Sequence, residues 1–326
     1  MHAIVVGRPP ERSLRWEEVA DPAAPPPGQV LVEVTATAIN RADLMQRAGR
    51  YPPPSGASDI LGLEIAGRIG ALGQGVTAWS AGDRVCAIVA GGAYAERCPV
   101  PAGSLMRVPE RLSLTEAAAV PEAFLTAYVN LFQEAELRAG ESVLIHGGAS
   151  GVGTAAIQLA ACAGARVAVT ARDERKLAVC RRLGAELAID HTGQDFAAEI
   201  EQAWGGVDMV LDIVGAGYLE RNLRVLAARG RLVLLATLGG SQATVDLAAL
   251  MRRRIRIIGS VLRGRSDEEK AAITAGFARR FLPLFEEGRL EPVIDRTLPI
   301  RQAGDAHALV ERFGNVGKVV LSVQER

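Results

Sequence analysis

The chain has 326 residues, about twice the length of a typical domain, so we expect two domains. Hydrophobic residues make up 49% of it, enough for full-sized cores, and 37 basic residues balance 37 acidic ones, giving a formal charge of zero. This balance gives no electrostatic reason to expect nucleic acid or an anionic membrane as a partner, and it mildly favours self-association.

The N-terminus and the cysteines indicate the compartment. The first apolar run, Ile4-Val5-Val6, soon meets Arg8-Pro9-Pro10, so it lacks the basic start and long apolar stretch of a signal peptide. No apolar run approaches the roughly 20 residues that span a bilayer. The four cysteines include no C-x-x-C pair, so we expect neither a disulfide framework nor a four-cysteine zinc site. We therefore expect a cytoplasmic protein with reduced thiols.

The first 120 residues predict a β-rich domain with tight corners. Residues 29–36 have strand character after a Pro25–Gly28 break, and residues 84–89 form a second strand after Gly82-Asp83. Residues 60–72 carry three glycines among apolar residues. Gly and Pro at this density favour a strongly curved sheet over a helical bundle.

From about residue 121 to residue 264, short apolar strands alternate with helical patterns. The predicted strands are 142–146, 166–170, 186–189, 207–214, 231–236 and 255–260, and the helical patterns between them include 153–163, 174–183 and 218–227. This alternation predicts an α/β domain with a doubly wound parallel sheet. Most of the strands are apolar on both faces, as a sheet covered by helices requires.

After the sixth strand the pattern changes again. A longer helix is predicted from Asp267 to about Glu287, and the tail 292–323 is strand-rich, like the first 120 residues. We therefore predict a discontinuous first domain, residues 1–121 and 265–326, into which the α/β domain, residues 122–264, is inserted.

A glycine-rich turn follows the first strand of the α/β domain. Gly151-x-Gly153-x-x-Ala156 has the dinucleotide-binding spacing: Gly151 permits the turn, Gly153 lets the backbone approach a pyrophosphate, and Ala156 lets the helix lie close to the sheet. The helix start offers free N–H groups to phosphates. Because the strand before, the helix after and the next strand fit a βαβ unit, cofactor binding is favoured over a merely structural turn.

The end of the second strand indicates which cofactor. NAD enzymes place an acidic residue there, but Thr170-Ala171-Arg172 has no carboxylate. Arg172, Arg175 and Lys176 cluster nearby and suit a 2′-phosphate, so NADPH is favoured over NADH. Asp173 is interpreted as a helix N-cap. The alternative for the three basic residues is a solvated helix face.

Six segments resemble one family in its own order along nearly the whole chain: Asn40–Leu44, Arg47–Pro54, Leu61–Gly67, Pro121–Tyr128, His146–Leu159 and Asn315–Val320. They are similar to the medium-chain dehydrogenase/reductase superfamily and, within it, to the zinc-free quinone oxidoreductase branch, especially the tumour-suppressor-inducible quinone oxidoreductases of animals. The resemblance implies a discontinuous GroES-like β-rich catalytic domain and a Rossmann NADPH-binding domain.

Two positions differ from the zinc-dependent members of that superfamily. Asn40 resembles the place of their first cysteine ligand, and Gly62-Leu63-Glu64 has Leu where they have a ligating His. The lobe with their structural zinc is also missing. The resemblance therefore implies no metal site.

The resemblance also implies site residues. Asn40, Tyr51 and Thr126 are placed around the nicotinamide; Tyr51 either donates a proton to the acceptor or only walls the pocket, and Asn40 buttresses it. Asp43 and Glu64 are interpreted as structural hydrogen-bond acceptors. With the residues of the glycine turn and the basic cluster, the predicted cofactor contacts are Ser150, Gly151, Val152, Gly153, Arg172, Arg175, Lys176, His191, Gly239, Gly240, Ser260, Val261, Leu262, Asn315 and Lys318.

Three functions stay open at this point. The first is NADPH-dependent reduction of quinones or similar conjugated carbonyls, whose intrinsic electrophilicity suits a site that relies on position and hydrogen bonding. The second is reduction of an enoyl or alkenal double bond, and the third is an NADPH-binding protein with a structural or sensory role. A homodimer is expected, with pairing along residues 255–260.

Overall fold

The computed structural model describes residues 1–324 and separates into two compact units. Unit 1 consists of Met1–Leu125 and Leu262–Arg326, and unit 2 consists of Thr126–Val261. The boundaries predicted from the sequence, 121/122 and 264/265, lie a few residues away and stay a prediction.

Unit 2 is built on a six-stranded sheet with strand order β10-β9-β8-β11-β12-β13. Every neighbouring pair is parallel, so the predicted doubly wound parallel sheet is confirmed. The first three strands are added in one direction from β8, and the next three are added in the opposite direction from β11. Dinucleotide-binding folds have this strand order. The strands are β8 (Ser142–His146), β9 (Arg166–Ala171), β10 (Leu187–Asp190), β11 (Val207–Asp212), β12 (Leu226–Leu234) and β13 (Arg256–Gly259).

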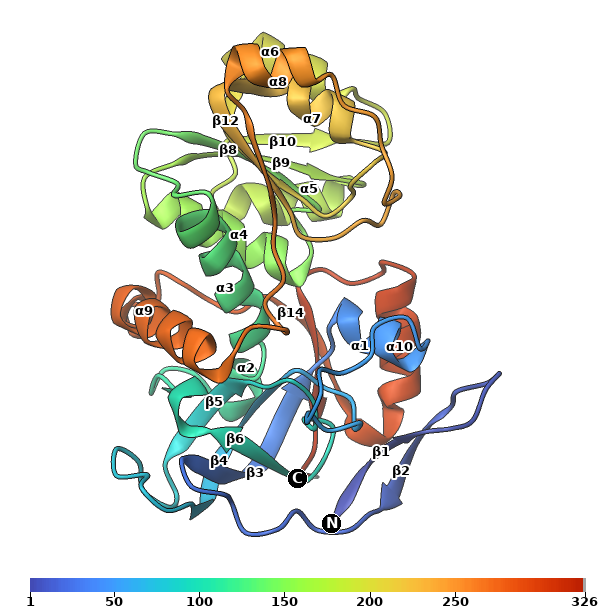
Figure 1. The fold of residues 1–326 in the computed structure, drawn as a ribbon, viewed down its shortest axis with the longest axis vertical. Helices are drawn as coiled ribbons and strands as arrows, with labels where there is room; N and C mark the ends of the chain where they lie inside the picture. The colour runs from blue at the N-terminus through green and yellow to red at the C-terminus, as the bar shows by residue number, and fades with distance from the viewer. Residues whose placement is uncertain (325–326) are drawn as a thin grey trace. The chain divides into compact units, whose positions relative to one another are not determined.

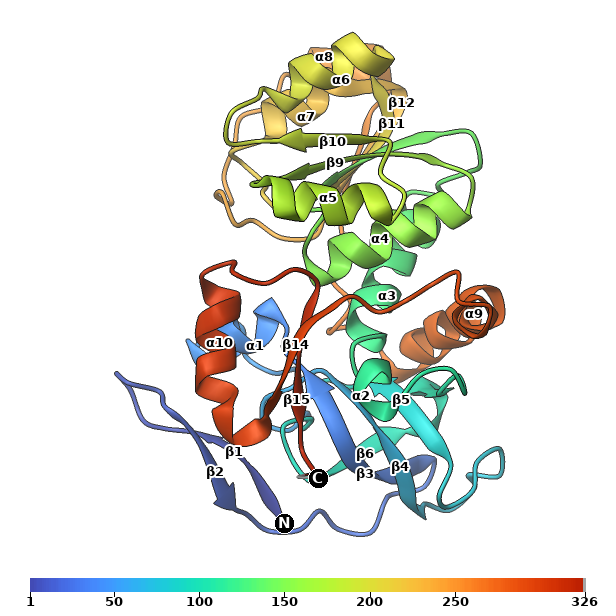
Figure 2. The same ribbon diagram turned by 180° about the vertical axis from the view of Figure 1, so that it is seen from behind.

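Helices cover both faces of this sheet. Figures 1 and 2 show α4 and α5 on one face and α6, α7 and α8 on the other. Their bounds are Gly151–Cys162, Glu174–Arg182, Phe196–Trp204, Leu219–Val225 and Leu247–Arg253. The predicted helix 218–227 is too long by two residues at its end, because Leu226 is buried and starts β12 opposite Val207.

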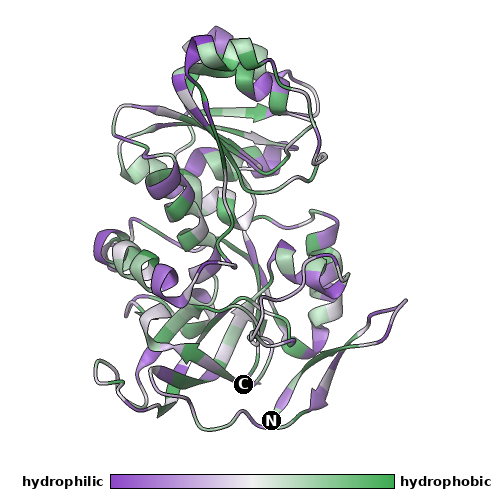
Figure 3. Ribbon diagram, viewed as in Figure 1, coloured by the Kyte–Doolittle hydropathy of each residue, from purple (hydrophilic) through white to green (hydrophobic). Residues whose placement is uncertain are grey.

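The core of unit 2 explains why most of its strands are apolar on both faces. Leu144, Val210 and Leu232 of neighbouring strands are fully buried, and Phe196 and Ile200 of α6 pack against them. Figure 3 shows hydrophobic colour along these strands and hydrophilic colour on the outer turns of the helices. Burial of this kind contributes about 1.5–3 kcal/mol for each large side chain.

Unit 1 contains a seven-stranded sheet of order β14-β15-β3-β4-β5-β7, with β6 also pairing with β3, and a separate β1-β2 hairpin. Because β15 pairs antiparallel with β3, opposing Val320 to Ala38, the C-terminal segment joins the sheet of the first 120 residues. The strands are β1 (His2–Val6), β2 (Leu14–Glu18), β3 (Gln29–Ala38), β4 (Glu64–Leu72), β5 (Arg84–Ile88), β6 (Arg97–Pro101), β7 (Leu105–Arg107), β14 (Ile294–Pro299) and β15 (Lys318–Ser322).

Gly67 shows why this sheet needs glycine. A Cβ on Gly67 of β4 would lie 2.0 Å from the carbonyl oxygen of Glu33 in β3, a distance that no side chain tolerates. Close backbone approach of this kind supports the predicted strong curvature.

Helices of unit 1 include α1 (Arg41–Arg47), α2 (Leu114–Ala117), α9 (Asp267–Glu286) and α10 (Ala303–Glu311). The helix predicted at 267–287 is confirmed as α9, which begins with a Ser266–Glu269 capping box. The strand-rich tail also holds α10, which the sequence analysis missed; its Ala303, Ala306 and His307 are buried. Short 3₁₀ turns are Ala102–Ser104 and Ile300–Gln302.

The chain passes from unit 1 to unit 2 within α3 (Pro121–Tyr128), which continues as a π-helical segment, Val129–Glu134. Single π-helical turns inside helices are rare and often occur at functional sites. Among residues 1–324, no helix is long and apolar enough to cross a membrane.

Candidate active site

The glycine-rich turn lies between β8 and α4 in unit 2. A Cβ on Gly153 would lie 2.3 Å from the Gly147 carbonyl oxygen, so only glycine fits at this contact. Ser150 is the N-cap of α4, and its hydroxyl accepts a hydrogen bond from the Gly153 amide at 3.0 Å. The first amides of a helix, here those of Gly151 and Val152, have no partner within it. The turn therefore fits a cofactor pyrophosphate, at the strand-order reversal where such ligands bind.

The end of β9 has the basic residues predicted to bind a 2′-phosphate. Arg172 and Arg175 are exposed, whereas Lys176 is buried. Asp173 is confirmed as the N-cap of α5, with its carboxylate accepting from the Lys176 amide at 3.0 Å. The pKa of His191 is lowered by burial and then by the positive charge of Arg172, so these two predicted residues interact electrostatically.

The other predicted cofactor residues of unit 2 follow β12 and β13. The Gly239 amide donates to Val214 and the Gly240 carbonyl accepts from Ala216, which ties the two loops together. The Ser260 amide donates to the carbonyl of Leu234, the last residue of β12, and Val261 is exposed. Leu262 is buried in unit 1.

Thr126 of unit 2 has a buried hydroxyl without a hydrogen-bond partner in the part of the chain that the structure describes. The carbonyl oxygen of the Asn130 side chain, one helical turn later, is also buried and unpartnered. A buried polar atom without a partner is costly, so both atoms fit contacts with a bound polar ligand.

A buried polar chain under the glycine turn was missed from the sequence. Nδ1 of His146 lies 2.9 Å from the Thr170 hydroxyl, and Nε2 lies 2.7 Å from the Asn222 side-chain oxygen. Since the Asn222 amide donates to Asp212 at 3.1 Å, His146 donates from Nε2 and accepts at Nδ1. Burial lowers the pKa of His146 to about 4, so the ring is neutral and joins β8, β9 and α7.

In unit 1, the side chain of Asn40 makes hydrogen bonds through both its nitrogen and its oxygen. Its amide nitrogen donates to the Ala38 carbonyl at 3.2 Å and to Glu64 Oε1 at 2.8 Å, and its oxygen accepts from Lys318 Nζ at 2.5 Å. Both amide protons are therefore used within the protein. The geometry supports a buttressing role for Asn40.

Lys318 and Glu64 form a buried ion pair with an Nζ–Oε1 distance of 2.7 Å. Lys318 also donates to the Ile39 carbonyl at 2.9 Å, so with Asn40 and Glu64 it has three protein acceptors. Glu64 Oε2 accepts from the backbone amide of Glu122 at 2.8 Å. The cofactor contact predicted for Lys318 stays a prediction. The structure shows that its ammonium binds Ile39, Asn40 and Glu64. Asn315 closes the preceding turn by donating to Gly317.

Asp43 is the second buried carboxylate of this region. It accepts from the amides of Asn40 (2.8 Å) and Gly62 (3.1 Å) and from the Tyr94 hydroxyl (3.2 Å). Burial raises the pKa of Asp43 to about 6 despite these bonds. The Tyr94 oxygen also lies 3.2 Å from Nε2 of the buried His307. Asp43 and Glu64 thus both act as structural hydrogen-bond acceptors.

Tyr51 lies half-buried under Arg263, whose guanidinium carbon is 5.2 Å from the ring centre. Sequence reasoning missed Arg263, although it directly follows the predicted cofactor residues 260–262. Its side chain donates to Gln46 of α1, and nothing in the neighbouring sequence indicates this contact. Burial raises the pKa of the nearby Glu122 carboxyl to about 8, and the negative charge of Glu64 adds to this effect.

Comparisons with known proteins decide the family. Sequence profiles described as "Alcohol dehydrogenase GroES-like domain" and "Zinc-binding dehydrogenase" match residues 26–110 and 151–275. Quinone oxidoreductase of Rattus norvegicus is 31% identical over 302 residues, which cover 91% of this chain and 90% of the relative. The chain belongs to the quinone oxidoreductase branch of the medium-chain dehydrogenase/reductase superfamily. Synaptic vesicle membrane protein VAT-1 homolog of Homo sapiens is 32% identical over 93% of this chain and 81% of the relative.

Solved structures of the superfamily agree. A mycobacterial protein in complex with NADPH has a TM-score of 0.87 at 30% identity, covering 99% of each chain. The JamJ enoyl reductase has a TM-score of 0.83 at 28% identity, covering 95% of each chain. The predicted fold class, a GroES-like β-rich part with a Rossmann part, is confirmed, and the chain is an oxidoreductase of the medium-chain superfamily.

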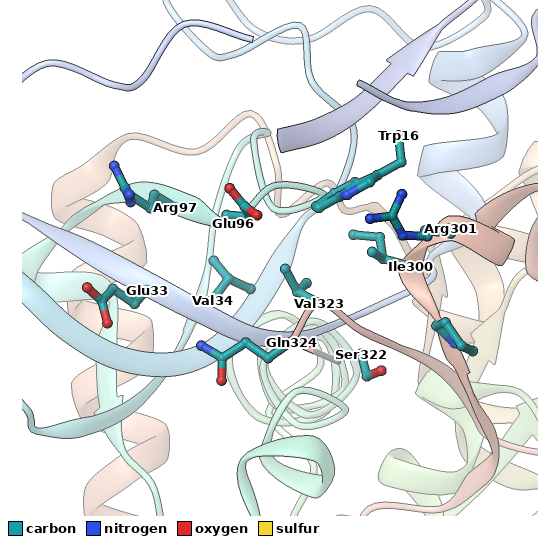
Figure 4. A pocket seen from close by; sticks show the side chains of 11 residues that line it. Trp16, Glu33, Val34, Glu96, Arg97, Ile300, Arg301, Ser322, Val323 and Gln324 are labelled. Atoms are coloured by element: carbon teal, nitrogen blue, oxygen red, sulfur yellow. The ribbon is translucent and has the colours of Figure 1, made fainter. Parts of the chain in front are cut away.

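A separate cavity of about 500 Å³ lies in unit 1 of this superfamily member (Figure 4). None of the predicted site residues lines it. Two of its charged residues have partners of their own: Arg97 pairs with Asp21 at 3.1 Å and Glu96 accepts from the His2 amide at 2.7 Å. Within residues 1–324, no group of three or more His, Cys, Asp and Glu side chains is arranged to hold a metal ion.

Proposed function

We propose that the protein reduces quinones or similar conjugated carbonyl compounds with NADPH and without zinc. The observation that carries the proposal is the Asn40–Glu64–Lys318 network. By resemblance, Asn40 and Leu63 stand where zinc-dependent members have ligands, and the Lys318 ammonium, 2.7 Å from Glu64, already supplies the positive charge there. A second cation beside a fixed ammonium is electrostatically unfavourable.

The residues of unit 2 support NADPH as the cofactor. The glycine turn accommodates the diphosphate, and the exposed Arg172 and Arg175 suit the 2′-phosphate. The unpartnered Thr126 hydroxyl suits a polar group of the nicotinamide end. NADPH, when bound, supplies the hydride.

In unit 1, Tyr51 is the residue proposed to act on the acceptor. Its hydroxyl donates a proton to the oxygen that gains charge as the acceptor is reduced. Asn40 orients the wall of the site, because its amide hydrogen bonds are all directed to the protein. A site that acts by positioning, hydrogen bonding and one proton donor suits acceptors that are already electrophilic, such as quinones and enones.

Reduction of an enoyl or alkenal double bond is the second candidate. It is favoured by the structural similarity to the JamJ enoyl reductase and by a 33% identical segment in a mycocerosic acid synthase-like polyketide synthase of Mycobacterium tuberculosis. The chain spans only 14% of that synthase, so the likeness concerns one of its parts.

A panel of acceptors tests the proposal. We expect oxidation of NADPH, followed by its absorbance, to be fastest with a naphthoquinone or an ortho-quinone and slower with a 2-alkenal. NADPH is expected to be preferred over NADH, and Arg172→Ala with Arg175→Ala to reduce that preference. A zinc chelator should leave the rate unchanged. Fastest turnover with the 2-alkenal would favour the second candidate, and equal rates with NADH would overturn the cofactor assignment.

We also propose a homodimer that pairs along β13. This strand is an edge of the six-stranded sheet, and its outer side has no strand partner among residues 1–324. Exposed apolar side chains gather in the same part of the sequence, namely Leu238, Leu247, Met251, Ile257 and Val261. An unpaired edge with apolar surroundings is a template for a second chain.

A further inference from the structure

Arg263 is a buried charge whose hydrogen bonds go to neutral acceptors. It is only 4% exposed. Its Nε and Nη2 donate to the Ala90 carbonyl at 2.9 and 2.7 Å, and Nη2 also donates to Gln46 Oε1 at 2.7 Å. Its third nitrogen, Nη1, is buried and has no hydrogen-bond partner among the described residues. A buried guanidinium left in this state needs compensation from another source.

The ring of Tyr51 supplies that compensation. The guanidinium carbon lies 5.2 Å from the ring centre, within the range of about 6 Å for an attractive contact between a cation and an aromatic face. A ring face also accepts N–H groups weakly, so the contact offsets part of what the guanidinium lacks in hydrogen bonds. The contact therefore stabilises the buried Arg263 charge and restrains the position of the Tyr51 ring.

Arg263 also joins three segments of unit 1. Gln46 belongs to α1, Ala90 follows β5, and Tyr51 begins the proline-rich loop Tyr51–Pro54. Gln46 is itself held, because its amide nitrogen donates to the Asp59 carbonyl at 3.2 Å. One side chain thus sets where the Tyr51 loop lies relative to α1.

We propose that Arg263 is a positioning residue for the reduction: it holds the Tyr51 ring by its face and makes the Tyr51 hydroxyl a better proton donor to the acceptor oxygen. This inference rests on the proposed function. As the acceptor gains a hydride, the Tyr51 O–H bond breaks and its proton forms a bond to the acceptor oxygen. The phenolate left beside the guanidinium then takes a proton from water.

The charges around Tyr51 agree with this role. Burial raises the pKa of Tyr51, the positive charge of Arg263 opposes that rise, and Glu122 adds to it when ionised. Because the pKa of Glu122 is raised to about 8, this carboxyl is mostly neutral at pH 7 and adds little repulsion. The negative charge of Asp43 also acts on Arg263, and the charges of Glu122 and Arg263 act on the buried Lys270 of α9. Acceptors whose oxygen becomes an anion on reduction benefit most.

The first test needs no substrate. Tyrosine labelled with ¹³C in the ring is titrated by NMR, and the Tyr51→Phe variant identifies the Tyr51 signal among the four tyrosines. Arg263→Met is expected to move the Tyr51 titration to higher pH, because a lowering charge is lost, whereas Arg263→Lys leaves it near that of the unmodified protein. Arg107→Met is the matched control, since Arg107 lies 4.8 Å from the ring of Trp79. An Arg263→Met titration identical to that of the unmodified protein overturns the proposal.

The second test is a double-mutant cycle on quinone turnover. Tyr51→Phe is expected to lower kcat by about a hundredfold, the lower end of what a positioned proton donor contributes, with a smaller loss of NADPH affinity. Arg263→Met is expected to lower kcat by at least about tenfold alone but by less than about twofold in the Tyr51→Phe background, because coupled residues are not additive. A full effect of Arg263→Met without the Tyr51 hydroxyl contradicts the proposal.

Failure of the proposed function and failure of the Arg263 proposal give different results. If the unmodified protein turns over no quinone, the proposed function fails, and the NMR titration still decides whether Arg263 acts on Tyr51. If Arg263→Met does not fold, Gln46→Leu replaces it, since this variant removes an anchor of Arg263 without touching the ring. A Tyr51 signal and a kcat unchanged in Gln46→Leu contradict the proposal.

Discussion

Lys318 connects residues that lie far apart in the sequence. Its ammonium contacts Ile39, Asn40 and Glu64, and the Glu64 carboxylate is fully buried. A buried ion pair contributes little net stability compared with apolar residues, but loss of one partner leaves an uncompensated charge. Lys318 therefore keeps Asn40 and Glu64 in place. We expect its substitution to lower the free energy of unfolding more than it lowers the affinity for the cofactor.

Lys318→Met tests this role. We expect the free energy of unfolding, measured by denaturant titration, to fall by about 3–5 kcal/mol, because Glu64 is left buried without its cation. The double variant Lys318→Met with Glu64→Gln should recover most of the loss. Arg289→Met is the control: it removes an exposed pair with Glu287 and should cost about 0–1 kcal/mol. A cost for Lys318→Met no larger than that of the control would show that the pair is not needed.

At the scale of elements, the β8–turn–α4 segment determines the cofactor site. Ser150 caps α4, and the first helical turn lies against the backbone of Gly147 and Gly148. The Gly153 position leaves no space for a side chain on that side. The free amides of the turn thus depend on a close backbone contact that only glycine allows.

Gly153→Ala is expected to disturb this contact. The added Cβ would meet the Gly147 oxygen at 2.3 Å, so the turn must move and its amides lose their arrangement. NADPH affinity, measured by calorimetry, should fall by at least about tenfold, or 1.4 kcal/mol. Gly304→Ala in α10 is the matched control, because a Cβ there meets nothing within 4 Å. Unchanged affinity in Gly153→Ala would place the diphosphate elsewhere.

At the scale of the whole molecule, the last strands of the two sheets differ. In unit 1 the last strand, β15, lies inside the sheet, with β14 on one side and β3 on the other. In unit 2, β13 pairs with β12 on one side, and apolar residues of α8 and β13 are exposed: Met251 is 77% and Leu247 is 69% accessible. Exposed edges of this kind are usually covered or charged in stable monomers.

The proposed dimer has a direct test. Light scattering is expected to give twice the 34.4 kDa mass of one chain. Ile257→Lys combined with Met251→Glu should reduce the mass to one chain, because charges then replace apolar contacts. Leu72→Lys, an exposed apolar position of unit 1, is the control and should leave the dimer intact. A monomeric unmodified protein would disprove the pairing.

Local patterns predicted what depends on neighbours in the sequence. Strand β8 at 142–146, helix α9 and the Asp173 cap follow from apolar periodicity and from side chains that bond within three residues. The same reasoning failed where a distant strand competed: Leu226 pairs with Val207 and leaves the predicted helix. It also missed α10, whose short apolar face lies in a tail that otherwise forms strands.

The sequence by itself determined the inserted parallel sheet, the glycine turn and the family. The sheet and the turn are encoded in the spacing of neighbouring residues, and the family is encoded in motifs that follow one another along the chain. The tertiary structure alone decided how the candidate site is assembled. Arg263 meets Gln46 across 217 positions and Lys318 meets Asn40 across 278, and no local preference encodes such partners. The Lys318 contact arises from the pairing of β15 with β3. Both contacts also reflect the burial of charges, which must find acceptors wherever the fold provides them.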